Sequence, residues 1–220
     1  MLTLNLAGVP SGVYDVFAYL NNGTVYFDLG PAWSNATTRS MALGMFLGSP
    51  VNSVAMTTVV NKHSVAAQAG LLLGAIYLES PGTVIFSRNA KNVSNLYNQR
   101  PAIVVFDGFY GIRAYGSQTY REWNGGVGNA RGRFVLPFGS EILFQFAAQM
   151  YQGGRAGISV NATNIADGTL ANDLAGWSAS SYFRGQLVSA GYNFFTMVES
   201  GWLPATAQFV SANACAALII

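Results

Sequence analysis

Short apolar runs, separated by turn residues, recur along the whole chain. Residues 13–20 read VYDVFAYL, and in an extended strand alternate side chains of this run would lie on opposite faces. Residues 25–29 alternate in the same way. The dipeptide Asn22-Gly23 between them tolerates the two positive φ angles of a type I′ turn. The pattern therefore predicts an antiparallel hairpin near the start of the chain.

The same reasoning predicts about a dozen strands, at residues 3–6, 13–20, 25–29, 54–59, 71–78, 103–106, 133–136, 141–150, 156–160, 192–198, 207–209 and 217–220. The connections are rich in Gly and Asn, as at 124–132 and 161–180. The spacing of Met41, Leu43 and Phe46 predicts one short helix within 38–46. We expect a single all-β domain over 1–220, a jelly-roll-like antiparallel β-sandwich in which residues 1–12 form a short strand and its connection.

Composition adds an unusual feature, because 51% of the residues are hydrophobic and only 9% are charged, against about 25% in soluble domains. The apolar runs 71–78 and 214–220 are too short for a spanning helix, which needs about 20 residues. Residues 1–6 lack the basic start and apolar length of a secretory signal. We expect a chain that is neither secreted nor inserted in a membrane, and that hides surface against copies of itself or a larger assembly.

Charge and cysteine content exclude further classes. The net charge is +2 and the basic residues are scattered, so nothing indicates nucleic-acid binding. The single cysteine, Cys215, rules out an intrachain disulfide, and its apolar surroundings favour a buried structural role. Such a chain suits assembly in a reducing cytoplasm.

Candidate chemistry is sparse. His63 is the only histidine, no G-x-S-x-G elbow occurs, and we expect His63 in an exposed loop rather than in a hydrolytic triad. One His and one Cys cannot form a zinc shell. Asp167 and Asp173, with Asn161 nearby, could offer oxygens to a calcium ion, but their spacing is not that of an EF-hand and favours an Asx-turn loop. We expect no metal and no cofactor, and whether an ion stabilises the loop between Asn161 and Asp173 stays open.

Carboxylates and tryptophans leave a glycosidase as an alternative, because two carboxylates suffice for that reaction. The candidates are Glu122, Glu141 and Glu199, with Trp123, Trp177 and Trp202 as sugar-stacking platforms. The loop 122–133 lacks the G-K-[ST] ending of a phosphate-binding loop. We expect its arginines Arg131 and Arg133, with Arg121 before them, to pair with carboxylates across a subunit boundary.

The most polar segment is 88–100, which contains Arg88, Lys91 and Arg100 and no acidic residue. We interpret this segment as a solvated loop or a short helix. The alternative interpretation is a basic contact surface for a neighbouring subunit.

Five short sequence motifs, which we call words, resemble those of a domain of tailed bacteriophages. That domain is found in tail fibres, head fibres and capsid decoration proteins. The words are GVYDVFAYLNNGT at 12–24, AWSNATTR at 32–39, LLGAIYLE at 72–79, NLYNQRPAIVV at 95–105 and SAGYNFFTMVESG at 189–201. Their order and spacing match the family across nearly the whole chain, with departures at Tyr77, Ala102 and Asn193. The resemblance implies a jelly-roll fold and a homotrimer with apolar residues along the three-fold axis.

It also implies a non-enzymatic structural protein on the virion surface, assembled in the host cytoplasm. A capsid decoration or head-fibre protein is the preferred interpretation, because a tail fibre normally needs a long shaft and an anchor and we expect nearly all of this chain to be one globular domain. Attachment would then use the surface of that domain or that of a partner. The expected partners are other copies of the chain and the major capsid protein or a tail protein. The alternatives are a receptor-binding tip that recognises host glycan and a polysaccharide depolymerase. The candidate glycan or partner contacts are Tyr120, Trp123, Arg131, Arg133, Trp177 and Tyr182. We expect the four aromatic residues among them in exposed loops, where their rings could stack on sugars.

Overall fold

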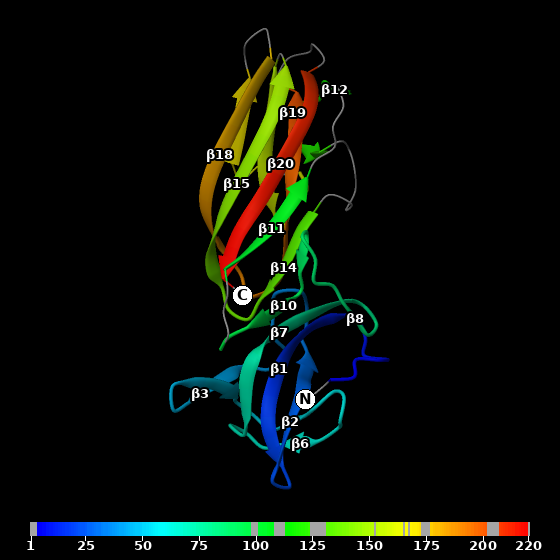
Figure 1. Ribbon diagram of the computed structural model, residues 1–220, viewed down its shortest axis with the longest axis vertical. Helices are drawn as coiled ribbons and strands as arrows, with labels where there is room; N and C mark the ends of the chain where they lie inside the picture. The colour runs from blue at the N-terminus through cyan, green and yellow to red at the C-terminus, as the bar shows by residue number, and fades with distance from the viewer. Residues whose placement is uncertain are drawn as a thin grey trace.

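The computed structural model describes residues 4–97, 101–107, 113–123, 131–151, 153–164, 166, 168–172, 177–201 and 207–219. Within these residues most of the chain is β-strand, and no α-helix occurs there. The strands form an elongated molecule with two regions stacked along its long axis (Figure 1). We call residues 4–97 the N-terminal region and residues 101–219 the C-terminal region. The expected all-β, jelly-roll-like antiparallel class is confirmed.

The N-terminal region is built on one main sheet. Its strand order is β2 (Thr24–Ala32), β1 (Gly12–Asn21), β7 (Gly70–Ser80), β4 (Ser49–Asn52) and β3 (Leu43–Phe46), with β8 (Thr83–Val84) and β10 (Val93–Asn95) paired to β7. A small second sheet joins β5 (Met56–Thr57) to β6 (Ser64–Val65). The predicted hairpin is present, since Asn21 pairs with Thr24 around the turn residues Asn22 and Gly23.

The C-terminal region is a sandwich of two sheets. The first, sheet D, has the order β11 (Pro101–Asp107), β20 (Ala207–Ile219), β15 (Ser140–Tyr151) and β18 (Trp177–Val188), with β12 (Arg113–Tyr115) on β20. The second, sheet C, has the order β17 (Gly168–Asn172), β16 (Gly154–Val160), β19 (Gly191–Gly201), β14 (Arg131–Leu136) and β9 (Ala90–Lys91), with β13 (Arg121–Glu122) on β19. Strand β9 comes from the N-terminal region, so the two regions share a sheet.

The main core lies between sheets C and D. Along β15 the side chains of Phe144 and Phe146 are buried and that of Leu143 is exposed, as strand alternation requires. Phe144 meets Phe195 of β19 edge to face, with ring centroids 5.5 Å apart. Because both inner faces contribute large apolar side chains, the sandwich excludes water along its length.

The structure corrects the short helix expected within 38–46. Residues Leu43–Phe46 form strand β3, which pairs with β4 in a tight hairpin. The turn residues Leu47 and Gly48 have φ angles of 48° and 82°, outside the helical range. The apolar spacing that suggested a helix therefore belongs to a strand and to Met41, which is buried in a cluster with Phe17.

Other boundaries also differ. Residues 4–6 are not a strand, and the expected strand 54–59 shrinks to β5. The two strands expected at 207–209 and 217–220 are one, β20, because β11 and β15 pair with it on both sides. The expected loop 161–180 contains β17 and the start of β18, which β15 pairs along its full length.

The polar segment 88–100 is not a helix in the part that the structure describes, up to residue 97. It supplies β9 to the C-terminal region and β10 to the N-terminal region. The nitrogen of Val105 donates to the carbonyl of Arg88, which fixes the segment against β11.

Candidate functional site

The junction between the two regions contains a bidentate ion pair. The Arg39 guanidinium donates to both carboxylate oxygens of Asp15, at 2.7 and 3.0 Å, and also to the carbonyl of Pro137 in the C-terminal region. The same guanidinium lies over the Trp33 ring, 4.3 Å from its centroid. Burial raises the pKa of the Asp15 carboxyl above its ordinary value, and the charge and hydrogen bonds of Arg39 oppose this rise.

A polar turn before Arg39 meets the start of β19. The Asn35 side chain accepts hydrogen bonds from the backbone nitrogens of Thr37 and Thr38, which shapes the turn. The nitrogen of Tyr192 donates to the carbonyl of Ala36 at 2.8 Å. A Cβ at Gly191 would lie 2.1 Å from that carbonyl oxygen, so only glycine allows this approach.

A second ion pair crosses the junction from β14 to β7. The Arg133 guanidinium donates to Glu79 at 2.8 Å, and the Asn92 amide donates to the other oxygen of the same carboxylate. Beside it Tyr77 and Tyr192 pack with ring centroids 4.0 Å apart. Burial first, and then the neighbouring Tyr77 hydroxyl, raise the pKa of Tyr192 to about 12.

These contacts connect the words that carry the family resemblance. Asp15 and Arg39 come from the first and second words, and Tyr77 and Tyr192 come from the third and fifth. In the fourth word, Asn95 pairs with Gly74 of the third. Residues of four of the five words thus meet at the junction between the two regions, while the Asn95–Gly74 pair lies within the N-terminal region.

The arginines predicted to bind a neighbouring subunit instead pair within the chain. Arg131 binds Glu122 at 2.7 Å and lies over the Phe194 ring, while Arg121 binds the fully buried Glu199. Arg121, Arg131 and Arg133 thus each have a carboxylate partner in their own chain, and whether they also contact a neighbouring subunit stays a prediction. The partners of Arg121 and Arg133 are 78 and 54 residues away in sequence, whereas that of Arg131 is only nine residues away.

The candidate contact residues do not form one surface site. Trp123 was expected in an exposed loop, but it is 0% exposed and packs edge to face against Phe209, because it extends from β13 into the core of the sandwich. Tyr120 is half-buried just before β13. Trp177 and Tyr182 lie in strand β18 rather than in a loop, and their side chains lie outside the described part of the structure. Whether these residues contact glycan or a partner stays a prediction.

The three candidate glycosidase carboxylates lie apart. Arg121 pairs in register with Glu199, and Glu122 pairs with Val198, so the Glu122 and Glu199 side chains lie on opposite faces of sheet C. Glu141 is exposed at the start of β15, in the other sheet. Trp202 lies outside the described residues.

His63 is half-buried rather than exposed. The Tyr19 hydroxyl and the His63 Nδ1 are 2.9 Å apart, and the Tyr26 ring packs against the imidazole. Among the described residues, no three His, Cys, Asp or Glu side chains gather as metal ligands, and no helix there is long and apolar enough to cross a membrane.

The candidate calcium loop falls mostly outside the described residues, which include neither Asp167 nor Asp173. Asn161 is described, and both ends of its amide are bound to β19. Its Oδ1 accepts from the nitrogen of Phe194, and its Nδ2 donates to the Asn193 side chain.

The outer face of sheet D is the most distinctive exposed surface. Ile103, Leu143 and Leu187 on this face are 58%, 51% and 79% exposed. Ile103 and Leu143 both pair in register with Ala217, so they lie in one row across β11, β20 and β15. Among the described side chains of this face, the only charged one is that of Glu141, the register partner of Leu187. An antiparallel sheet face in water is normally polar, whereas the described side chains of this face include three exposed aliphatic ones beside the half-buried Gln145 and Gln149.

The size of this face suits an interface. With strands about 4.8 Å apart and a rise of about 3.4 Å per residue, its four long strands cover roughly 700 Å². A standard protein interface buries about 800 Å² on each partner. We refer to this surface, marked by Ile103, Leu143 and Leu187, as the sheet D face.

No protein-family model and no curated protein match the chain. Among solved structures, the infectious bursal disease virus Gx strain aligns with 99% of this chain and 68% of its own, at 13% identity and a TM-score of 0.37. Latent PorU from Porphyromonas gingivalis and a β-porphyranase from Bacteroides plebeius align at TM-scores of 0.37 and 0.33, and this chain spans only 23% and 30% of their length. All of these TM-scores lie below 0.5, and the proteins are of different kinds. The similarity therefore does not indicate a function for this chain.

Proposed function

We propose that this chain is a non-enzymatic structural protein of a bacteriophage virion surface, a capsid decoration or head-fibre protein that associates as a homotrimer. The observation that supports this proposal is the distribution of charge and apolar surface. Among the described residues, four ion pairs lie within the chain, and three aliphatic side chains of the sheet D face are exposed. A chain that pairs its charges internally and exposes aliphatic side chains on a sheet face is suited to burying that face against other copies.

The mechanism is multivalent burial of apolar surface. Three copies that share the sheet D face around an axis would remove Ile103, Leu143 and Leu187 from water. The trimer would then present three equal surfaces to the capsid shell, where several weak contacts add through effective concentration. Such binding needs no catalytic group.

Two of the glycosidase candidates also fit a structural role better than catalysis. Glu122 and Glu199 are each bound to an arginine, at 2.7 and 2.9 Å. These ion pairs give both carboxylates a partner within the fold, as a structural role requires. Removing either partner of such a buried pair should reduce folding stability.

The experiment is to count copies of this chain in purified virions by quantitative mass spectrometry against the major capsid protein. We expect on the order of tens to hundreds of copies in multiples of three, as a symmetric shell requires. A count of about a dozen or fewer would contradict decoration and favour a fibre or receptor-binding role. Purified chain should also stabilise heads that lack it, and the variant Leu187→Asp should not.

A further inference from the structure

Strand β18 (Trp177–Val188) is a long edge strand with an open side. It has 12 residues and lies at the end of sheet D, where all of them pair with β15 without a bulge. Among the described residues, no strand or loop bonds to its other side. Its sequence has no proline, and Arg184 is its one charged residue. Figure 1 shows β18 along one side of the C-terminal region. Such a row of unpaired backbone groups is a template for another strand.

The other strands at the ends of the large sheets are short or covered, as is usual in β proteins. Strands β3, β9 and β17 have only four, two and five residues. Strand β11, at the opposite end of sheet D, begins with Pro101, which has no backbone donor. Its edge is covered where the Val105 nitrogen donates to the Arg88 carbonyl. Strand β18 has neither kind of protection.

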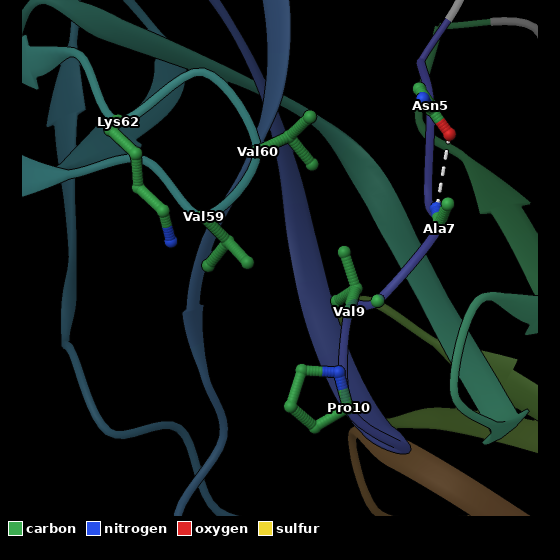
Figure 2. A pocket seen from close by; sticks show the side chains of 8 residues that line it. Asn5, Ala7, Val9, Pro10, Val59, Val60 and Lys62 are labelled. Carbon is green, nitrogen blue, oxygen red and sulfur yellow. Dashed lines mark hydrogen bonds between the residues drawn. The ribbon is translucent and has the colours of Figure 1, made fainter.

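The edge of β2, the next longest of these strands, is covered by the loop that follows β5. The Val59 nitrogen of this loop donates to the Leu29 carbonyl of β2, and Pro31 interrupts the row of donors. Figure 2 shows the loop, with Val59 and Lys62, across a cavity of about 380 Å³ from Pro10 in the segment before β1. A second strand therefore cannot pair along β2 without displacing this loop.

We propose that β18 of one copy pairs antiparallel with β18 of a second copy. In the described part of the chain no other strand offers an open edge of this length, and an antiparallel edge is complementary to its own copy across a two-fold axis. A pairing of β18 with β11 of the next copy would form a ring or a filament, but the segment at Arg88 covers β11. Because each copy has one such edge, the pairing closes at two copies.

The extent of the contact fits a specific interface. Two antiparallel strands of 12 residues can form about 12 hydrogen bonds, because half of the residue pairs exchange two bonds each. A typical protein interface contains about ten. Each bond replaces bonds to water and gains little by itself. We therefore expect pairing that is weak between dilute copies and strong where copies are held side by side.

This edge contact goes beyond the proposed trimer and does not depend on it, because the trimer uses the face of sheet D and leaves its edge unpaired. The two-fold axis joins the sheets of both copies into one, and their sheet D faces then point to the same side. A three-fold contact through the face and a two-fold contact through the edge would connect trimers to one another, as in a layer on a shell.

Amide hydrogen exchange, measured residue by residue by NMR, tests the pairing. Alternate amides of a strand point to opposite sides, so half of the β18 amides bond to β15 and half point to the open edge. We expect the open-edge half to exchange roughly tenfold slower at high than at low protein concentration. The amides of β3, a short edge strand, are the control and should exchange equally in both samples. Fast exchange of the open-edge amides at both concentrations would contradict the pairing, and so would slow exchange at both.

Cysteine cross-linking locates the two-fold axis. In a Cys215→Ala background, single cysteines are placed in turn at each position of β18 from 179 to 187. Only residues near the axis lie next to their own copy, so the yield of disulfide-linked dimer on a non-reducing gel should peak at one or two neighbouring positions.

The matched control is Ala147→Cys, the register partner of Ser181 one strand further in, on β15. The two β15 strands stay at least about 14 Å apart across the paired edges, beyond the reach of a disulfide. If every β18 cysteine cross-links no better than Ala147→Cys, the edge pairing is wrong. If the chain is then still oligomeric, copies meet through another surface and the proposed self-association stands.

Discussion

The two regions of this molecule hold their strands together by different means. In the C-terminal region two sheets face each other, and aromatic side chains such as Phe146 and Phe195 fill one continuous core. In the N-terminal region a single main sheet is covered largely by loops, and its apolar residues form smaller clusters. Two buried polar side chains, Asp28 and Asn52, hold those loops through hydrogen bonds to their backbone. The stability of the C-terminal region therefore depends on core packing, while that of the N-terminal region depends also on side-chain hydrogen bonds.

Truncation of a core phenylalanine should have the largest effect and should separate the regions. We expect Phe195→Ala to lower the free energy of unfolding by about 4 kcal/mol, because the close-packed sandwich cannot collapse around the cavity. Phe17→Ala, in a cluster covered partly by loops, should cost about 3 kcal/mol. Urea unfolding measures both. A larger loss for Phe17→Ala would contradict the comparison.

Breaking the Asp15–Arg39 ion pair at the junction should cause the next largest loss of folding stability. In Arg39→Ala, Asp15 stays buried at 6% side-chain exposure without its partner, so we expect a loss of about 3 kcal/mol. Arg39→Lys should recover only part of this loss, because one ammonium group cannot replace the bidentate contact. Thermal unfolding of both variants checks this. If the transition of Arg39→Lys equals that of the unmodified chain, the bidentate geometry is unimportant.

The variant Asp28→Asn tests whether side-chain hydrogen bonds stabilise the loops of the N-terminal region. The Asp28 carboxylate accepts from three backbone nitrogens, those of Leu29, Val60 and Asn61. Asp28→Asn turns one acceptor into a donor, and we expect a loss of about 2 kcal/mol. Hydrogen exchange should speed up at Val60 and Asn61 and stay unchanged in β15. Equal acceleration in both regions would show that the effect is global.

The tyrosine pair at the junction should give an effect that is absent at neutral pH and appears only in alkaline solution. The folded-state pKa of Tyr192 is about 12, against an ordinary value of 10.0. The folded state therefore keeps a proton that the unfolded chain loses, and stability should fall as the pH rises from about 10 to about 12. Tyr192→Phe should reduce this fall, while Tyr97→Phe, which changes an exposed ring, should not. Denaturant unfolding at several pH values measures the difference.

The elements that could be predicted from the sequence are those determined by residues adjacent to one another in the chain. Asn22-Gly23 defines its hairpin through the backbone preferences of two residues, and the alternation in 13–20 defines the adjoining strand. Leu47 has the opposite preference from the one its turn requires, so the β3–β4 hairpin could not be found in this way. Strand β20 was divided because its middle is polar, and only pairing on both sides makes it continuous.

The contacts of the candidate site depend on positions far apart in the chain. Arg133 binds Glu79 across 54 residues, and Arg39 binds Asp15 across 24. Spacing within a motif cannot reveal such pairs, because they form only when the fold brings two distant segments together. The resemblance words did contain a signal, since an aspartate in the first word and an arginine in the second are complementary. The single-domain organisation stays a prediction.

The most direct test of the central claim is the mass of the purified chain in solution, measured by sedimentation equilibrium at low and high salt. Apolar association through the sheet D face predicts a particle of three chains whose stability does not fall when salt rises, because few exposed charges take part. Leu143→Asp should dissociate it. A chain that stays monomeric at every concentration, or a trimer that separates in high salt, would contradict the account.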